Sequence, residues 1–440
     1  MNATRLSPEE QKTYKGMLQE VFSLRRFQEE RSLKGMRALL AAMGNPLRGT
    51  TCVQIAGTNG KGSTAACLQS ILHKAGIRTG LFTSPHLNDF RERYRIDGED
   101  VPDRSIFEAL PKILHLARQT GFPVLFFEIA TALAVHLFAD AGIEVAIFEV
   151  GLGGELDATT AIETHLSIIT SIGYDHCQWL GETLEEIAEQ KAGILRPGIP
   201  WICGVEKASV LQSIVKKADQ VKAGESMLYQ ENFSLSEGGE FWSGEDELQG
   251  IFPGLQGDFQ RKNAALAIAG AQLLSKRGFH CSPAAVREGV AEVRWPGRLQ
   301  RVSVEGKELW LDGAHNVDAA KALKAFCHKN FPGKSIRLLF SCMKDKDFQA
   351  FLEILIDDCV AVHLFPLEGP RAISPKAVAD WVVAQTESVR CTISYSATKA
   401  LQEAFALVDK NEILLATGSL FAVGQILHDL PALTRSKMEP

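Results

Sequence analysis

The sequence lacks long apolar runs, paired cysteine motifs and an excess of positive charge, and each absence excludes a class of protein. No apolar run reaches the roughly 18 residues that span a membrane, so we expect no membrane partner. The 47 basic residues are outnumbered by 53 acidic ones, which argues against a nucleic-acid-binding surface. The nine cysteines form no C-x-x-C pair, as expected of reduced thiols in the cytoplasm. The polar, acidic first ten residues resemble neither a signal peptide nor a transit peptide.

The chain is otherwise typical of a globular enzyme, since 45% of its 440 residues are hydrophobic and 23% are charged. This length suggests two or three domains. Residues 8–43 read as helical, and strand and helix patterns then alternate up to about residue 204. Residues 205–256 are polar and irregular and predict short strands, before an alanine-rich helix begins near residue 259.

The helical pattern breaks at residues 295–299, where we expect a domain boundary. Five strands are predicted after it, separated by helices of ordinary length: Leu309–Leu311, Ile336–Phe340, Ala361–Phe365, Thr392–Tyr395 and Ile413–Ala416. This β-α-β-α order predicts an α/β fold with a second, smaller domain that contains a parallel sheet.

A glycine-rich turn has the clearest chemical pattern. Residues 54–64 read QIAGTNGKGST, after an apolar run and before a helical pattern. A strand, a glycine loop and a helix N-terminus can surround a phosphate with N–H groups, and Lys61 adds a positive charge. The common form is G-x-x-x-x-G-K-[ST], whereas Gly62 here replaces the hydroxyl that usually holds magnesium. The pattern predicts a phosphate loop whose metal ligands lie elsewhere; a glycine turn with a solvated lysine is the alternative.

A second apolar run, residues 145–150, carries a carboxylate near its end and leads into Gly151-Leu152-Gly153-Gly154. A dinucleotide-binding fingerprint would need glycine or alanine at position 156, where this chain has leucine. In a nucleotide site, Glu149 would instead be the acid that reaches Mg²⁺. A strand-end glutamate in solvent is the remaining alternative.

Several motifs occur in an order that resembles one family. They are Gly57–Ser63, Ser84–Leu87, Glu92–Ile96, Glu149–Gly154, Leu156–Thr159, Asp175–His176, Lys191–Ile194, Pro296–Arg298 and Asp312–Asn316. The set, between about residues 30 and 425, closely resembles the bacterial folylpolyglutamate synthase/dihydrofolate synthase family. That family is a branch of the Mur-ligase-like ATP-dependent amide ligases.

The resemblance implies a P-loop-containing ATPase domain over residues 1–297 and a smaller Rossmann-like domain over residues 298–440, with ATP between them. It implies that the carboxylate of dihydropteroate or a reduced folate attacks the γ-phosphate of ATP. The amine of L-glutamate would then displace phosphate from the acyl phosphate to form the amide. Mg²⁺ and a lysine would offset the charge on the transferred group. A monomeric cytoplasmic enzyme is expected.

The resemblance also assigns individual residues. The implied ATP contacts are Thr58, Asn59, Gly60, Lys61, Gly62, Ser63, Asn263, Arg298 and Asp312. The implied metal ligands are Ser84, Glu149, His176 and Lys191, and the implied catalytic residues are Lys61, Lys191 and His176. The implied dihydropteroate contacts are Leu125, Leu156, Asp157 and Ala158. Ser84 would supply the hydroxyl that the loop lacks, and Lys191 matches a lysine that the family carbamylates.

Four departures from the family pattern, at five positions, bear on pterin and chain-length specificity. Glu155 stands where many members have arginine, Thr160 replaces a frequent asparagine, Asp258 replaces a frequent histidine, and Gly173-Tyr174 replaces a usual Ala-Leu.

Three alternative functions remain at this point. A Mur-type ligase that adds an amino acid to a peptidoglycan precursor would be expected to carry a further N-terminal domain. A P-loop kinase or GTPase-like switch would be expected to have serine or threonine directly after Lys61. A non-catalytic relative would be expected to have lost Lys61, Glu149 or His176, and all three are present.

Overall fold

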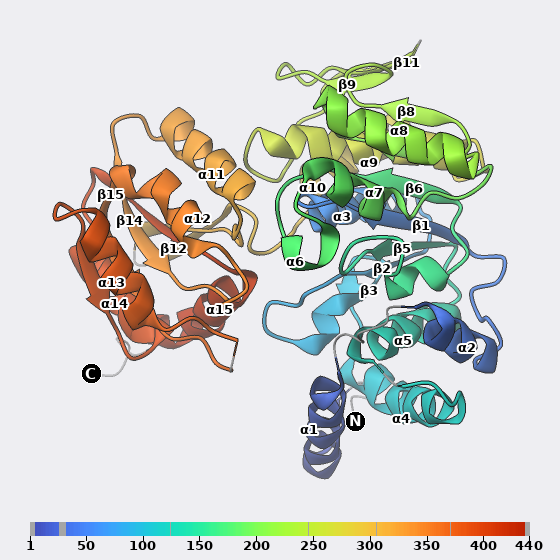
Figure 1. Ribbon diagram of the computed structural model, residues 1–440, viewed down its shortest axis with the longest axis horizontal. Helices are drawn as coiled ribbons and strands as arrows, with labels where there is room; N and C mark the ends of the chain where they lie inside the picture. The colour runs from blue at the N-terminus through green and yellow to red at the C-terminus, as the bar shows by residue number, and fades with distance from the viewer. Residues whose placement is uncertain are drawn as a thin grey trace.

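Two sheets, each covered by helices, form two lobes that lie side by side (Figure 1). The computed structural model describes residues 5–25, 32–123, 125–244, 246–304, 306–369 and 371–435. The N-terminal lobe contains the elements from α1 to α10, and the C-terminal lobe contains those from β12 to α15. Residues 295–299 connect the lobes and are called the linker below.

The sheet of the N-terminal lobe has eight strands in the order β4-β3-β2-β5-β1-β6-β7-β8. Their bounds are β1 Thr51–Ala56, β2 Thr79–Phe82, β3 Tyr94–Ile96, β4 Glu99–Asp100, β5 Val145–Glu149, β6 Leu166–Ile169, β7 Trp201–Cys203 and β8 Ser226–Leu228. The six strands from β2 to β8 in this order run parallel, while β3 and β4 form an antiparallel edge. All six residues of β1 are buried, because helices cover both faces of this central strand.

Helices pack on both faces of this sheet, including the part that β6, β7 and β8 form. Their bounds are α1 Pro8–Ser23, α2 Lys34–Ala42, α3 Lys61–Lys74, α4 Asp103–Gln119, α5 Phe126–Asp140, α6 Cys177–Leu180, α7 Leu184–Ala192, α8 Ala208–Val221, α9 Phe259–Ser275 and α10 Pro283–Glu292, with 3₁₀ turns at Phe90–Arg93 and Ala158–Ala161. Alternate strand residues enter different cores. Cys52 packs with the core of α1, α2, α4 and α5, whereas Val53 packs with that of α3, α9 and α10.

The structure tests two predictions that the sequence made for this lobe. The helical segment 8–43 contains α1 and α2, and residues 26–31 lie outside the described residues. The expectation of only short strands over 205–256 is wrong in its first part, because α8 occupies Ala208–Val221. Its apolar residues, Val210, Leu211, Ile214, Val215 and Ala218, recur at helical spacing and pack on one core, so the polar composition of the segment was a misleading guide. The predicted short strands do follow, as a three-stranded antiparallel sheet of β9 Phe233–Leu235, β10 Phe241–Ser243 and β11 Asp246–Leu248.

The C-terminal lobe has a six-stranded sheet in the order β12-β13-β17-β14-β15-β16. The bounds are β12 Gln300–Val304, β13 Lys307–Leu311, β14 Ser335–Phe340, β15 Cys359–Leu364, β16 Arg390–Ile393 and β17 Glu412–Thr417. Its helices are α11 Val317–Asn330, α12 Phe348–Leu355, α13 Pro375–Gln385, α14 Ala397–Leu407 and α15 Leu420–Arg435, with a 3₁₀ turn at Ile356–Asp358. All five strands predicted after the linker are present, and their ends differ from the predicted ones by a few residues at most. The sequence did not predict β12, which pairs antiparallel with β13.

The hydrophobic cores of the lobes separate within the linker. Trp295 packs against the core of α3, α9 and α10, and Leu299 belongs to the core of the C-terminal sheet. All nine cysteines are unpaired. No helix among the described residues is long and apolar enough to cross a membrane.

Candidate active site

The phosphate loop, residues 57–63, connects β1 to α3 and needs glycine at two positions. Gly57 has φ +149° and Gly60 has φ +88°. A Cβ atom on Gly57 would lie 1.9 Å from Thr170 Oγ1, and one on Gly60 would lie 2.4 Å from Asn263 Oδ1. Gly60 is also the N-cap of α3. The loop therefore offers the unpaired N–H groups of a helix N-terminus, the arrangement that binds phosphate.

Two lysines converge on this loop, the half-buried Lys61 and the buried Lys191. Lys61 Nζ donates hydrogen bonds to the carbonyls of Gly57 and Thr58 at 3.0 and 3.1 Å, and Lys191 Nζ donates to the same Gly57 carbonyl at 2.9 Å. Burial lowers the pKa of both amines, and the charge of Lys61 helps to bring the pKa of Lys191 to about 7. In the described part of the chain neither Nζ has a carboxylate partner. A phosphate group could therefore be the anion that pairs directly with these amines.

Ser84 and Glu149 lie together at the carboxyl ends of the adjacent strands β2 and β5. The backbone N–H of Ser84 donates to Glu149 Oε2 at 3.1 Å, and the Glu149 side chain is only 6% exposed. Burial raises the pKa of this carboxyl group, and Lys61 opposes the shift. A hydroxyl and a carboxylate are hard donors, so this pair fits Mg²⁺.

His176 lines the cavity on which Ser84 also lies, and it has φ +54° just before α6. Burial lowers the pKa of its imidazole to about 4, so the ring is neutral near pH 7 and can act as a metal ligand. Within the residues that the structure describes, no group of three or more His, Cys, Asp or Glu side chains is arranged to hold a metal. A metal here would need the Ser84 hydroxyl and oxygens of the nucleotide to complete its ligands.

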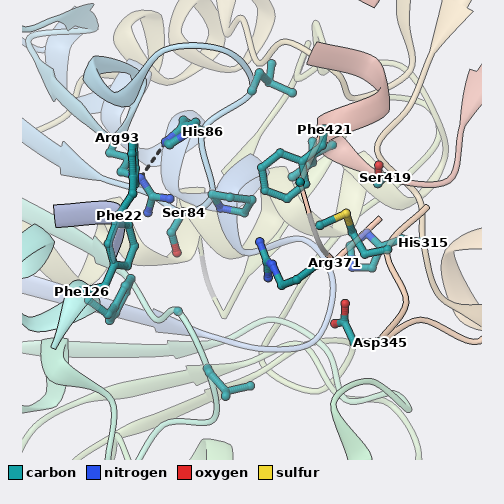
Figure 2. A pocket seen from close by; sticks show the side chains of 18 of the residues that line it. Phe22, Ser84, His86, Arg93, Phe126, His315, Asp345, Arg371, Ser419 and Phe421 are labelled. Carbon is teal, nitrogen blue, oxygen red and sulfur yellow. Dashed lines mark hydrogen bonds between the residues drawn. The ribbon is translucent and has the colours of Figure 1, made fainter. Parts of the chain in front are cut away.

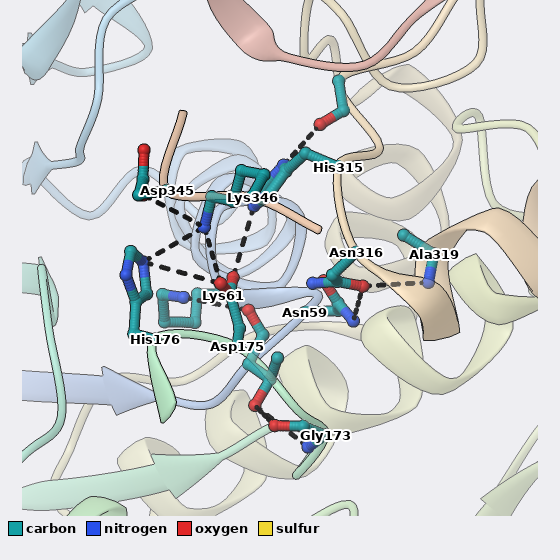
Figure 3. A network of polar contacts seen from close by, with 12 residues as sticks. Asn59, Lys61, Gly173, Asp175, His176, His315, Asn316, Ala319, Asp345 and Lys346 are labelled. Carbon is teal, nitrogen blue, oxygen red and sulfur yellow. Dashed lines mark hydrogen bonds and ion pairs between the residues drawn. The ribbon is translucent and has the colours of Figure 1, made fainter. Parts of the chain in front are cut away.

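A polar network around Asp175 joins the two lobes (Figure 3). Lys346 Nζ donates to Asp175 Oδ1 at 2.6 Å and lies 3.3 Å from His176 Nε2. His315 Nε2 lies 3.4 Å from Asp175 Oδ2, while its Nδ1 donates to the Gly313 carbonyl at 2.8 Å. Burial alone would raise the pKa of Asp175, but the hydrogen bond from His315 and the charges of His315, Lys346 and His176 hold it well below its usual range. Two side chains of the C-terminal lobe thus lie at the edge of the phosphate-loop region.

Asn59 joins the phosphate loop to the C-terminal lobe. Its Nδ2 donates to Asn316 Oδ1 at 3.3 Å, and Asn316 Nδ2 donates back to Asn59 Oδ1 at 3.0 Å. Asn316 is the N-cap of α11, since its Oδ1 accepts from Ala319 N at 3.0 Å. Asn59 was predicted as an ATP contact, but in this structure its side chain is used between the lobes and its backbone N–H donates to Ser171 Oγ at 3.0 Å.

The remaining ATP positions lie on both sides of the linker. Asn263 is 7% exposed, borders Gly60, and donates to Gln260 Oε1 at 2.8 Å. The Asp312 carboxylate accepts the N–H groups of Leu299 and Ala314 at 2.8 and 2.9 Å. Burial raises the pKa of Asp312, and the charge of Arg298 opposes that shift. Asp312 therefore holds the linker in place within its own lobe.

A cavity of about 1070 Å³ lies between the lobes and contains the substrate positions Leu125, Leu156, Asp157 and Ala158 together with Ser84 and His176. Figure 2 shows its two walls, with Phe22, His86, Arg93 and Phe126 on one side and His315, Asp345, Arg371, Ser419 and Phe421 on the other. Phe22 stacks on Phe126 with ring centroids 5.9 Å apart and an angle of 30°. The wall of the N-terminal lobe thus combines aromatic rings with Arg93 and His86, and the wall of the C-terminal lobe combines polar and charged side chains with Phe421.

Asp157 fixes the backbone of a glycine turn that lines this cavity. Its Oδ2 accepts the N–H groups of Gly151 and Leu152, both at 3.0 Å, and its Oδ1 accepts Thr159 N at 3.0 Å and Oγ1 at 2.6 Å. Both oxygens are engaged within the chain, and burial raises the pKa of the carboxyl group. The carboxylate thus holds the glycine turn, residues 151–154, against the cavity.

The positions that depart from the family pattern face different surroundings. Glu155 is half exposed, lies 3.5 Å from Lys217 Nζ and is not among the residues that line the cavity. Thr160 donates to the Gly154 carbonyl at 2.7 Å. Asp258 pairs with Lys329 of the C-terminal lobe at 3.0 Å. Tyr174 is 51% exposed.

Several cavity residues escaped sequence reasoning. Phe22 has only the apolar spacing of an amphipathic helix, which does not distinguish a core residue from a cavity wall. Lys346 lies in Lys344-Asp345-Lys346-Asp347, a charged run that usually indicates a solvated loop. Arg371 has no surrounding motif. Only the tertiary structure brings these three side chains to the cavity.

Comparison with known families gives two matches. Residues 55–271 match the Mur ligase middle domain, and residues 297–420 match the Mur ligase, glutamate ligase domain.

Among individual relatives, the Bacillus subtilis dihydrofolate synthase/folylpolyglutamate synthase is 35% identical over 404 residues, which cover 89% of this chain and 93% of the relative. The Escherichia coli protein of the same name is 31% identical, with 86% of each chain covered. Among solved structures, E. coli FolC in complex with DHPP and ADP superimposes with a TM-score of 0.86 at 28% identity, covering 96% of this chain and 98% of that one. The bifunctional folylpolyglutamate synthase/dihydrofolate synthase from Yersinia pestis, complexed with AMPPNP and Mn ion, gives 0.84 at 31% identity, covering 97% and 100%.

Proposed function

The chain belongs to the dihydrofolate synthase/folylpolyglutamate synthase family of Mur-type ligases, and from this we propose that it uses ATP to join L-glutamate to dihydropteroate and to reduced folates. The observation that carries the proposal is the cavity between the lobes. It is lined by aromatic side chains, Ser84 and His176 from the N-terminal lobe and by polar side chains from the C-terminal lobe. A flat pterin ring, a carboxylate to be activated and an amino acid would need these surroundings.

We propose that the phosphate loop and Lys61 bind the phosphates of ATP. The N–H groups at the start of α3 and the Lys61 ammonium carry positive charge, whereas Glu149 is the buried acid nearby that lowers the cost of burying Lys61. Preorganised charges of this kind stabilise the transferring phosphoryl group. Removing one of them commonly costs on the order of a hundredfold in rate, and this is the loss we expect for Lys61→Ala.

Ser84, Glu149 and His176 would hold Mg²⁺, and Lys191 would support it. When bound, the ion would neutralise part of the charge on the phosphates. The protein's own contribution is the hydrogen bond from Ser84 N to Glu149, which keeps the two donors adjacent, and the neutral imidazole of His176. A Ser84→Ala enzyme whose activity keeps the Mg²⁺ dependence of the wild type would contradict this assignment.

We propose that Lys191 is carbamylated. Carbamylation requires a neutral amine, whose lone pair attacks CO₂ and whose nitrogen then loses a proton. The lowered pKa of Lys191 supplies that form at neutral pH. The product is an anion beside Lys61, so it would replace repulsion between two ammonium groups by attraction.

The two ends of the cavity suggest where the substrates bind. The Phe22 ring is 41% exposed and stacks on the buried Phe126, and its exposed surface suits a planar heterocycle. Arg371 and His315 lie at the opposite wall, where the carboxylates of L-glutamate would find positive or hydrogen-bonding partners. The Asp175 network would hold this wall close to the phosphate loop, so we propose that domain closure completes the site.

We further propose a domain boundary between residues 297 and 298, a monomer and a cytoplasmic location. Trp295 and Leu299 belong to different cores, which supports the boundary. The monomer is what the family resemblance implies. The unpaired cysteines agree with a reducing compartment.

The decisive experiment is ATP-dependent phosphate release with dihydropteroate, tetrahydrofolate or a muramyl precursor, each with a panel of amino acids. We expect release only with a pterin substrate and L-glutamate. Release only with the muramyl precursor would favour the Mur-type alternative, which the family comparison supports less.

A further inference from the structure

Trp295 of the linker lies directly against the phosphate loop. A Cβ atom on Gly62 would lie 2.8 Å from Trp295 Nε1 and 3.2 Å from its Cε2 and Cζ2 atoms. Gly62 is the second residue of α3 and follows Lys61. The indole therefore occupies the space that a serine or threonine side chain would need at this position of the common phosphate loop.

Arg95 stacks on the same indole. The Arg95 guanidinium carbon lies 4.7 Å from the centroid of the Trp295 ring, and its Nε donates to Asp100 Oδ1 at 2.8 Å. Arg95 and Asp100 belong to the paired strands β3 and β4. A cation over an indole is the strongest of the cation–π pairs. Trp295 is thus held by two elements of the N-terminal lobe, α3 and the β3–β4 pair.

The chain passes to the C-terminal lobe immediately after Trp295. The Gly313 N–H donates to the Gly297 carbonyl at 2.9 Å, and the Leu299 N–H donates to Asp312 Oδ2 at 2.8 Å. Gly297 has φ +72°, and Leu299 has φ +41°, an unusual value for a leucine. The chain is therefore hydrogen-bonded to the C-terminal lobe on both sides of the proposed boundary, and Pro296 alone separates Gly297 from the indole.

We propose that Trp295 is a positioning residue, the fixed point about which the C-terminal lobe turns, and that it couples the phosphate loop to Arg298. Arg298 follows Trp295 by three residues, its Nη1 borders Gly313, and its charge acts on Glu149 and Lys61. A shift of the indole would move Gly62 and Lys61 on one side and Arg298 on the other. This inference rests on the proposed function only for the identity of the nucleotide.

A double-mutant cycle between Gly62 and Trp295 tests the contact. The methyl group that Gly62→Ala adds would collide with the indole, so we expect the Kd for ADP to rise about tenfold in the wild-type background. In the Trp295→Ala background the space is free, and the same change should alter the Kd by less than about twofold. Equal effects in both backgrounds would overturn the proposal.

A kinetic comparison separates positioning from a general loss of structure. We expect Trp295→Ala to raise the KM for ATP about tenfold and leave the KM for the pterin substrate unchanged, while Trp295→Phe, which keeps a ring over Gly62 and under Arg95, recovers most of the loss. Trp242→Ala is the matched control, because that indole is 42% exposed on β10. Unchanged KM for ATP in Trp295→Ala, or an equal rise in Trp242→Ala, would contradict the proposal.

Arg95→Gln gives a second route if Trp295→Ala does not fold. It loosens the indole without removing it, so the cost of Gly62→Ala for ADP binding should fall, and an unchanged cost would count against the proposal. Calorimetry with ADP needs no folate substrate. A wild-type protein that fails to bind ADP would refute the proposed function, whereas ADP binding without coupling would refute only the role of Trp295.

Discussion

Carbamylation of Lys191 is the property whose test depends most directly on the structure. The perturbation is Lys191→Arg, which keeps a positive charge but cannot form a carbamate under these conditions. Lys191 and Lys61 share the carbonyl of Gly57 as a hydrogen-bond acceptor, at 2.9 and 3.0 Å. An arginine would preserve the repulsion that the carbamate relieves. We expect kcat to fall by on the order of a hundredfold or more, the scale for losing one preorganised charge.

The magnitude of carbamylation follows from the pKa of Lys191. A value of about 7 leaves roughly nine amines in ten neutral at pH 8, whereas an ordinary lysine leaves fewer than about one in a hundred. The direction of the pH dependence follows from burial, which disfavours the ammonium form, so Lys191 loses its proton as the pH rises through about 7. At constant dissolved CO₂, the carbamylated fraction should therefore rise steeply below pH 7, where each carbamate formed from the ammonium releases two protons, and less steeply above pH 7, where it releases one, until the site is saturated.

The assay is ¹³C NMR of the protein in ¹³C-bicarbonate, with native mass spectrometry for a labile adduct of about 44 Da. We expect one carbamate resonance that follows this pH profile and is absent from Lys191→Arg. Lys191→Glu, which places a carboxylate near the same point, should retain more activity than Lys191→Arg. The reasoning is refuted if the wild type shows no resonance that Lys191→Arg lacks, or if the arginine variant keeps full activity.

Three further changes test other parts of the account. Phe22→Ala should raise the KM for the pterin substrate roughly three- to tenfold with the KM for ATP unchanged, because an aromatic contact contributes about 1 kcal/mol; Phe22→Trp should restore binding, and equal shifts in both KM values would contradict this. Glu155→Arg should leave the KM for dihydropteroate within about twofold, because Glu155 faces Lys217 in an exposed pair; a larger change would place it at the substrate. Glu128 is buried and its pKa is raised to about 7, so the folded protein favours the protonated carboxyl group. This preference stabilises the fold fully below the pKa that Glu128 has in the unfolded chain, and the stabilisation is lost as the pH rises through 7. The unfolding free energy of Glu128→Gln minus that of the wild type should therefore rise by about 2 kcal/mol from pH 5 to pH 8.5, as measured by urea denaturation. A difference that does not change with pH would contradict the burial of the charge.

The sequence alone was sufficient to predict the parts of the site that are formed by residues adjacent in the chain. The phosphate loop is a local pattern of glycines, one lysine and a following helix, and both Gly57 and Gly60 have the positive φ values that such a turn needs. Strand periodicity after the linker was equally local, and the predicted strands are present. β12 escaped because it is a short edge strand, whereas α8 escaped because polar residues dominate the composition of a segment whose apolar residues do have helical spacing.

Only the tertiary structure decided which side chains meet. Asn59 and Asn316 are 257 residues apart, and Asp175 and Lys346 are 171 apart, so their contacts depend on how the lobes pack. Gly62 looked like a missing metal hydroxyl in the sequence, and the folded chain shows that an indole from the linker fills that space. Local periodicity constrains the backbone of each element, whereas the position of one lobe against the other is set by side chains that no local pattern brings together.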